Sequence, residues 1–206
     1  EGLLQRTLPP EELDRAWAEL RTGGSYDLNQ LAETLTAAGY SRCDQVEGVG
    51  QFALRGGILD VYSPGMEQPV RAEFFGDELD AMGLFDPATQ RRTENVERAV
   101  LLPAAEALPH LAPGGTAGLA ARLEKLAAGA EKAGRHELAQ TLRQDREALE
   151  QGRSFPATDR YLALIYPQLA TAADYLPPDA CVLFSESSRV GERAKTYQWQ
   201  LEEDAK

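Results

Sequence analysis

Alternating apolar and polar residues dominate the middle of the chain, from Gln51 to Phe85. Within each run the apolar side chains recur at every second position, which places them on one face of an extended strand. Pairs and triplets rich in Gly and Pro separate the runs, and these residues favour tight turns. The pattern predicts an antiparallel meander with strands near residues 52–55, 58–62, 70–75, 79–85 and 97–102.

The same alternation separates two faces of the predicted sheet. One face carries apolar side chains and predicts the core side: Phe52, Leu54, Val70, Ala72 and Phe74. The other face carries Arg55, Arg71, Glu73 and Phe75. Exposed Arg beside an aromatic ring is typical of a protein-binding hot spot. The alternation alone favours a plainer interpretation, in which Arg71 and Glu73 make ordinary cross-strand surface pairs, and the binding role is the alternative.

Helical spacing flanks the meander on its N-terminal side. Residues 1–38 are predicted to be mostly helical, with a first helix from Pro9 through Leu20 that ends at Gly23-Gly24. A second helix follows Asp27, a favourable N-cap residue, and ends at Gly39.

The C-terminal half changes character. Ala-rich segments within residues 116–152 predict two helices with their break marked by Gly129 and Gly134. Residues 181–186 form a short apolar run that predicts a strand buried on both faces, followed by a helix over residues 187–206. Together these elements predict an α/β (α+β) protein: a small antiparallel meander flanked by helices, with a helical insertion and a partial α/β segment at the C-terminal end.

Composition narrows the possible functions. The net charge of −12 over 206 residues disfavours a broad basic nucleic-acid footprint. Cys43 and Cys181 lie far apart, which indicates reduced thiols in a cytoplasmic protein. No apolar run is long enough for a membrane span, and the absence of an initial Met suggests a segment of a longer polypeptide.

Signatures of catalysis are missing from the sequence. It contains no phosphate loop, dinucleotide-binding glycine motif or zinc-protease motif, so we predict no catalytic, cofactor-binding or metal-binding residues. His110 and His136 are interpreted as surface residues, and Asp77, Glu78 and Asp80 as solvated charges beside a turn.

Three separated phrases carry a family resemblance. They are GYSRCDQVEGVGQFALRGGILDVYSP, PVRAEFFGDELDAMGLFD and TQRRTENVERAVLLPA, in this order. Together they resemble the N-terminal region of the bacterial transcription-repair coupling factors (Mfd), a module also found in the excision-repair protein UvrB. The match is strong from about Leu28 to Glu106 and weaker over RYLALIYP, ADYLP and the closing residues.

The resemblance implies a domain plan and a role. Residues 1–27 would be a helical connector at the end of domain 1a, residues 28–106 the UvrA-binding domain 2, and residues 107–206 a helical insertion followed by a domain 1b-like segment. The implied function is recruitment of UvrA to stalled RNA polymerase in transcription-coupled excision repair. This segment would be non-catalytic, whereas the parent resembles an ATP-dependent DNA translocase whose other domains engage RNA polymerase and DNA.

Family positions that contact UvrA match Arg42, Arg55, Arg71 and Glu73 here, and Arg42 enters the predicted site by resemblance alone. Two departures matter. Ala53 stands where UvrB has a second Arg, and Gly83 stands where relatives commonly carry Arg, which predicts a less basic fourth strand. The alternatives are the equivalent region of UvrB, and a structural module that contacts DNA in the parent motor.

Overall fold

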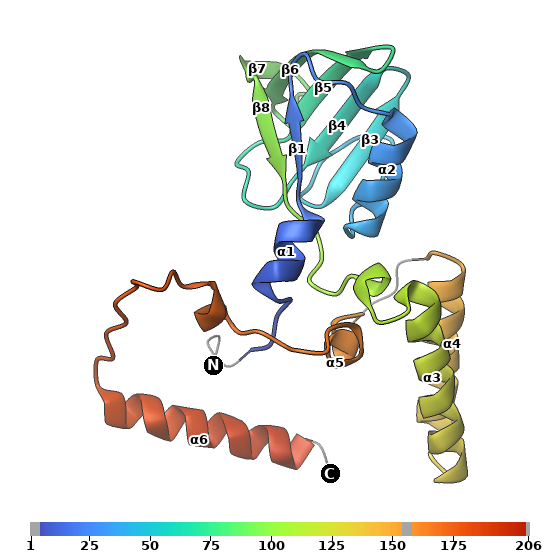
Figure 1. Ribbon diagram of the computed structural model, residues 1–206, viewed down its shortest axis with the longest axis vertical. Helices are drawn as coiled ribbons and strands as arrows, with labels where there is room; N and C mark the ends of the chain where they lie inside the picture. Colours follow the sequence, from blue (N-terminus) through green and yellow to red (C-terminus); the bar gives the residue numbers. More distant parts are fainter. Residues whose placement is uncertain (1–4, 154–157, 205–206) are drawn as a thin grey trace.

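The computed structural model of the chain describes residues 5–153 and 158–204 (Figure 1). It is a mixed α+β structure, which confirms the predicted fold class. A β-rich unit lies at one end of the molecule, and most of the helices gather at the other (Figure 1). The strands are β1 Ala18–Arg21, β2 Ser41–Arg42, β3 Gln51–Arg55, β4 Ile58–Tyr62, β5 Val70–Phe75, β6 Glu78–Phe85, β7 Arg92–Asn95 and β8 Arg98–Leu101. The α-helices are α1 Pro10–Ala16, α2 Leu28–Ala37, α3 Gly115–Lys132, α4 His136–Glu150, α5 Leu162–Ile165 and α6 Ser187–Asp204.

Six strands form the main sheet in the order β2-β3-β4-β5-β6-β7. The pairs from β3 to β7 are antiparallel, which confirms the meander, and its turns fall at the predicted glycines. Gly56 and Gly76 adopt positive φ angles of 59° and 64°, a region that favours glycine. The edge strands β2 and β7 were not predicted, and β2 runs parallel to β3.

A second, two-stranded sheet joins β1 to β8 in antiparallel register, with Leu20 opposite Ala99. The prediction of a continuous helix through Leu20 is therefore wrong, because α1 ends at Ala16 and the chain continues as a strand. Leu20 is fully buried in the core of the main sheet. A long-range pairing overrides the local helical spacing here, and β8 pairs with β1 instead of extending the meander.

The core of the β unit lies between the main sheet and α2. The predicted core residues Phe52, Val70 and Ala72 are fully buried, and Leu54 and Phe74 pack against the same cluster. Helix α2 covers this face and contributes Leu35 and the adjoining Ala38. These contacts confirm which side of the meander faces inward.

Asp27 caps α2 as predicted, since its Oδ1 accepts hydrogen bonds from the backbone N–H groups of Asn29 and Gln30 at 2.8 and 3.0 Å. We expect Asp27→Ala to lower the free energy of unfolding by about 1 kcal/mol, because two first-turn N–H groups lose their acceptor. Urea denaturation measures this change. Glu33→Ala, an exposed change within the same helix, is the matched control and should cost less than about 0.5 kcal/mol. Equal losses for the two variants would contradict a capping role.

The helical part has its own core. Helices α3 and α4 form a hairpin, and α3 buries Leu119, Leu123 and Ala127 against a cluster that includes Leu8 and Tyr166. The predicted break at Gly129 is wrong, because α3 continues to Lys132; Gly134, with φ of 75°, lies in the turn. The Tyr166 hydroxyl donates to the carbonyl of Glu106 at 2.7 Å and ties the segment after α4 to the end of the β unit.

The predicted buried strand at residues 181–186 is also wrong. Residues 181–184 have no regular secondary structure, and Leu183 is 89% exposed. The described residues provide no β partner for this run, so its apolar side chains stay in solvent. The helix after it is confirmed as α6, up to Asp204. None of the described helices combines the length and the hydropathy needed to cross a membrane.

Candidate functional site

The sheet face opposite α2 is divided into a covered half and an open half. The loop between β2 and β3 folds over the covered half, where Val46, Ala53 and Phe85 are fully buried together. Cys43 packs at the border of this small cluster, and burial raises the pKa of its thiol. The small side chain at Ala53 leaves room for this cover, so only the remaining half of the face can meet a partner.

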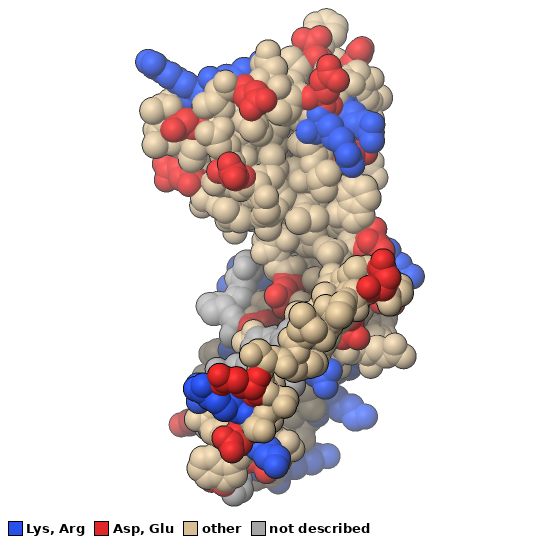
Figure 2. Space-filling view, turned by 90° about the vertical axis from the view of Figure 1, so that its left-hand side faces the viewer, with Lys and Arg blue, Asp and Glu red and all other residues tan. Residues whose placement is uncertain are grey.

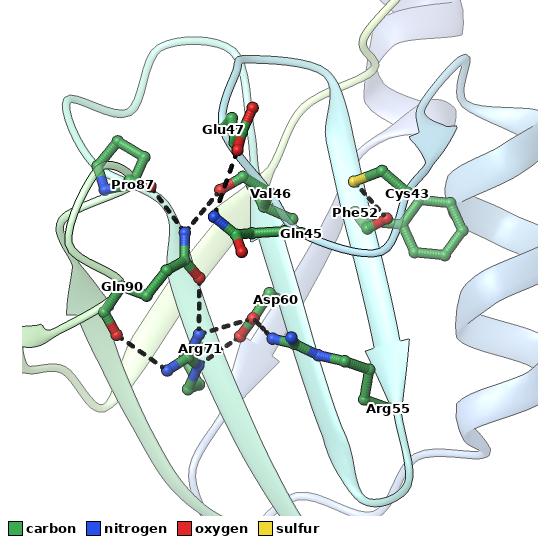
Figure 3. A network of polar contacts seen from close by, with 10 residues as sticks. All are labelled: Cys43, Gln45, Val46, Glu47, Phe52, Arg55, Asp60, Arg71, Pro87 and Gln90. Atoms are coloured by element: carbon green, nitrogen blue, oxygen red, sulfur yellow. Dashed lines mark hydrogen bonds and ion pairs between the residues drawn. The ribbon is translucent and has the colours of Figure 1, made fainter.

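A buried carboxylate lies at the centre of this face. Asp60 is 0% exposed and lies between Arg55 and Arg71, as Figure 3 shows. Its Oδ1 accepts from Nε of Arg71 at 2.7 Å, and its Oδ2 accepts from Nη2 of Arg71 at 2.8 Å and from Nη2 of Arg55 at 2.7 Å. The register of β4 with β5 places Asp60 directly opposite Arg71, which allows the bidentate pair.

Arg71 is held on three sides. Its guanidinium carbon lies 4.5 Å from the centre of the buried Phe85 ring, within the range of a cation–π contact. Gln90 accepts from Arg71 through its backbone carbonyl and its Oε1, each at 3.2 Å. The hydrogen bonds to Asp60 raise the pKa of Arg71, so the side chain stays charged. Arg71 is consequently a rigid cation with a side chain only 20% exposed.

The side-chain amide nitrogen of Gln90, which does not contact Arg71, is also held in place. Its Nε2 donates to the carbonyls of Pro87 at 2.7 Å and Val46 at 3.1 Å, which joins the β6–β7 turn to the loop over the covered half (Figure 3). Gln90 adopts a positive φ of 60°, an uncommon conformation for a residue other than glycine. The network therefore extends without interruption from the β2–β3 loop to Asp60.

Glu73 pairs with a cation that the sequence patterns did not single out. Arg92 of β7 reaches across β6 and donates to Glu73 at 2.9 Å. It crosses at Gly83, where a Cβ atom would stand 2.7 Å from Nε of Arg92 and 2.6 Å from the carbonyl oxygen of Glu94. Gly83 thus admits both the β7 backbone and the Arg92 side chain. Although β6 lacks an Arg at this position, the neighbouring strand supplies a guanidinium to the same face.

Two exposed apolar side chains complete the open half. Ile58 is 38% exposed and lies opposite Glu73, and Phe75 is 85% exposed at the end of β5. We name this region the Arg55 surface, and it consists of Arg55, Ile58, Glu73, Phe75 and Arg92. The alternation along β4 could have indicated Ile58, because Ile58 lies two residues before Asp60 and therefore on the same face of the strand. Arg92 carried no such signal, since β7 is short and exposed throughout.

The five predicted site residues do not all lie together. Arg55, Arg71 and Glu73 share one face, with Phe75 at its end. Arg42 lies elsewhere: β2 places it opposite Phe52, whose side chain faces the α2 core, and Arg42 lines a cleft with Glu33 and Thr36 of α2. A partner on the Arg55 surface reaches Arg42 only around the edge strand β2.

Charge is distributed unevenly over the molecule. The face described above brings together three guanidinium groups and two carboxylates, on a chain whose net charge is −12. In the view of Figure 2, basic side chains occur in small groups beside acidic ones, and uncharged surface separates them. Within residues 5–153 and 158–204, no cluster of His, Cys, Asp and Glu has the arrangement of a metal site.

Comparison with known proteins identifies the β unit first. Residues 18–106 match the family described as the UvrB interaction domain. UvrABC system protein B of Thermotoga neapolitana is 36% identical over 97 residues, which is 47% of this chain and 15% of that protein. The β unit is therefore similar to the UvrB interaction domain.

Longer matches extend beyond the β unit. The transcription-repair-coupling factor of Bacillus subtilis is 33% identical over 202 residues, covering 95% of this chain and 17% of that protein. That of Myxococcus xanthus is 38% identical over 107 residues, covering 52% of this chain and 9% of that protein. The chain is thus similar to a transcription-repair-coupling factor over 95% of its own length, and it spans about 17% of the length of the Bacillus subtilis protein. The resemblance drawn from the three sequence phrases is confirmed.

Proposed function

We propose that the Arg55 surface binds UvrA and that the chain is the segment of a transcription-coupled excision-repair factor that recruits it. The observation that carries the proposal is the exposure and anchoring of the Arg55 side chain. Its side chain is 50% exposed and is anchored through one nitrogen to the buried Asp60. An anchored, half-exposed guanidinium is well suited to form a planar bidentate pair with a carboxylate of the partner.

The neighbours of Arg55 support a protein partner. Ile58 and Phe75 supply exposed apolar area between and beside the charged groups. Hot spots of protein interfaces combine Arg with apolar or aromatic anchors in this way, whereas a phosphate-binding surface relies on many unpaired cations. On this face Arg71 and Arg92 are already paired with Asp60 and Glu73.

Calorimetric titration of UvrA from the same organism with this chain tests the proposal. We expect saturable binding that weakens as salt concentration rises, because charged pairs contribute to the interface. Absence of saturable heat at micromolar concentrations would overturn the proposed function.

Phe75 provides a separate test of the same surface. With 85% of its surface exposed, the ring contributes little to folding, and Phe75→Ala should leave the unfolding free energy nearly unchanged. We expect the variant to bind UvrA about fivefold more weakly, since the ring is the largest apolar group on the Arg55 surface. Leu183→Ala, an equally exposed change outside this surface, is the control and should bind normally.

In the longer polypeptide, we propose that this segment is non-catalytic and acts in the cytoplasm. An ATP-dependent DNA translocase formed by other domains would bring it to stalled RNA polymerase. The boundaries expected from the resemblance remain part of this proposal, with domain 2 at residues 28–106 between the connector and the helical segment.

A further inference from the structure

Arg55 and Arg71 depend on Asp60 in different ways. A guanidinium carries five N–H donors. In the described part of the chain, Arg71 directs three nitrogens to Asp60 and Gln90, whereas Arg55 donates a single hydrogen bond, to Oδ2 of Asp60. Arg71 is therefore nearly saturated inside the protein, and Arg55 keeps most of its donors for a partner.

Asp60 itself has no access to solvent. At 0% exposure it cannot contact a partner directly, and a buried carboxylate is retained at a desolvation cost that its hydrogen bonds offset. One fixed carboxylate oxygen, Oδ2, accepts from both guanidinium groups. The position of Asp60 thus fixes the distance and angle between the internal cation and the external one.

Gln90 and Phe85 fix the opposite side of the same unit. The Phe85 ring lies under Arg71, and Gln90 holds Arg71 through two acceptors while it is itself anchored to Val46 and Pro87. Motion of Arg71 would carry Asp60 with it, and motion of Asp60 would release Arg55. A long Arg side chain that is anchored before binding loses less rotamer entropy when it pairs with a partner.

We propose that Asp60 is a positioning residue that holds the guanidinium of Arg55 ready for a carboxylate of the partner, with Arg71 and Gln90 fixing Asp60 from behind. This inference rests on the proposed function, because it assigns the organisation of the same surface. In this arrangement Arg71 acts mainly as an internal support of the surface and not as a contact to the partner.

A double-mutant cycle on UvrA binding tests the assignment. We expect Arg55→Ala and Asp60→Asn to weaken binding by about tenfold and about fivefold respectively. Because Asp60 acts through Arg55, the double variant should be no more than about twofold weaker than Arg55→Ala alone. Asp14→Asn, which removes an exposed carboxylate from α1, should bind normally. A simple structural role for Asp60 would lower stability without this coupling to Arg55.

The outcomes separate the two proposals. Effects of Asp60→Asn and Arg55→Ala that multiply, or an unchanged affinity for Asp60→Asn, would overturn the positioning role while leaving UvrA binding intact. Loss of saturable binding by the unmodified chain would overturn the proposed function instead. If thermal unfolding shows that Asp60→Asn does not fold, Gln90→Ala replaces it in the cycle. That variant should weaken binding about twofold to threefold in the presence of Arg55 and have no effect in its absence; full additivity would again exclude positioning.

Discussion

Reversal of charge at Arg55 is expected to weaken binding to UvrA at least tenfold, which corresponds to about 1.4 kcal/mol. Glu at this position would repel a partner carboxylate and would also stand beside Asp60, from which Nη2 of Arg55 is now only 2.7 Å away. The fold should survive, because Arg71 keeps its two hydrogen bonds to Asp60. Calorimetry of the Arg55→Glu variant gives the affinity, and thermal unfolding verifies the fold.

A matched control separates local contact from overall charge. Arg15→Glu makes the same change in net charge on α1, where Arg15 is exposed and, among the described residues, forms an ion pair with Glu12 three residues away. We expect its affinity to stay within about twofold of the unmodified chain, since screening limits interactions beyond about 10 Å at 0.1 M salt. An equal loss for both variants would indicate long-range repulsion, and no loss for Arg55→Glu would remove Arg55 from the site.

Local patterns predicted most of the meander because its strands are joined by short turns. The alternation at β3 and β5 and the glycines at the turns are visible within a few residues of each other, so the register follows from local information. Of the strands that were missed, β2 and β7 are short, exposed edge strands, and β1 depends on a distant partner. β1 pairs with β8 about 80 residues later, and the helical spacing of Leu13, Trp17 and Leu20 gave no sign of it.

Burial of the 181–184 run failed as a prediction for a related reason. A continuous apolar run indicates a buried strand only when the fold supplies neighbours on both sides, and the described residues supply none. The apolar composition of this run is compatible with a buried strand, but the run can form one only where a neighbouring strand pairs with it.

The sequence predicted which residues share this face of the sheet, but it did not predict how their side chains contact one another. Alternation placed Arg55, Arg71 and Glu73 on one face, and the structure places them there. It did not distinguish the enclosed Arg71 from the open Arg55, because that difference comes from Asp60 and Gln90. It also did not reveal Arg92, whose side chain reaches the face across Gly83 from a strand without apolar alternation.

Phe85 links the core of the β unit to this surface, and its removal should have the largest effect on stability. The ring is fully buried against Val46 and Ala53 and lies under the guanidinium of Arg71. We expect Phe85→Ala to lower the free energy of unfolding by about 3 to 5 kcal/mol, because it leaves a cavity in a cluster with few other large side chains. Urea denaturation followed by circular dichroism measures the loss.

Phe85→Leu separates the packing of this ring from its contact with Arg71. Leu fills much of the same volume, so we expect a loss of about 1 kcal/mol or slightly more, with the fold retained. Leu has no aromatic face, so this variant lacks the cation–π contact in which the guanidinium carbon of Arg71 lies 4.5 Å from the centre of the Phe85 ring. If Arg71 supports Asp60 as proposed, Phe85→Leu should bind UvrA about twofold to threefold more weakly despite its intact fold. A folded Phe85→Leu variant with unchanged affinity would show that Asp60 holds Arg55 without support from beneath Arg71.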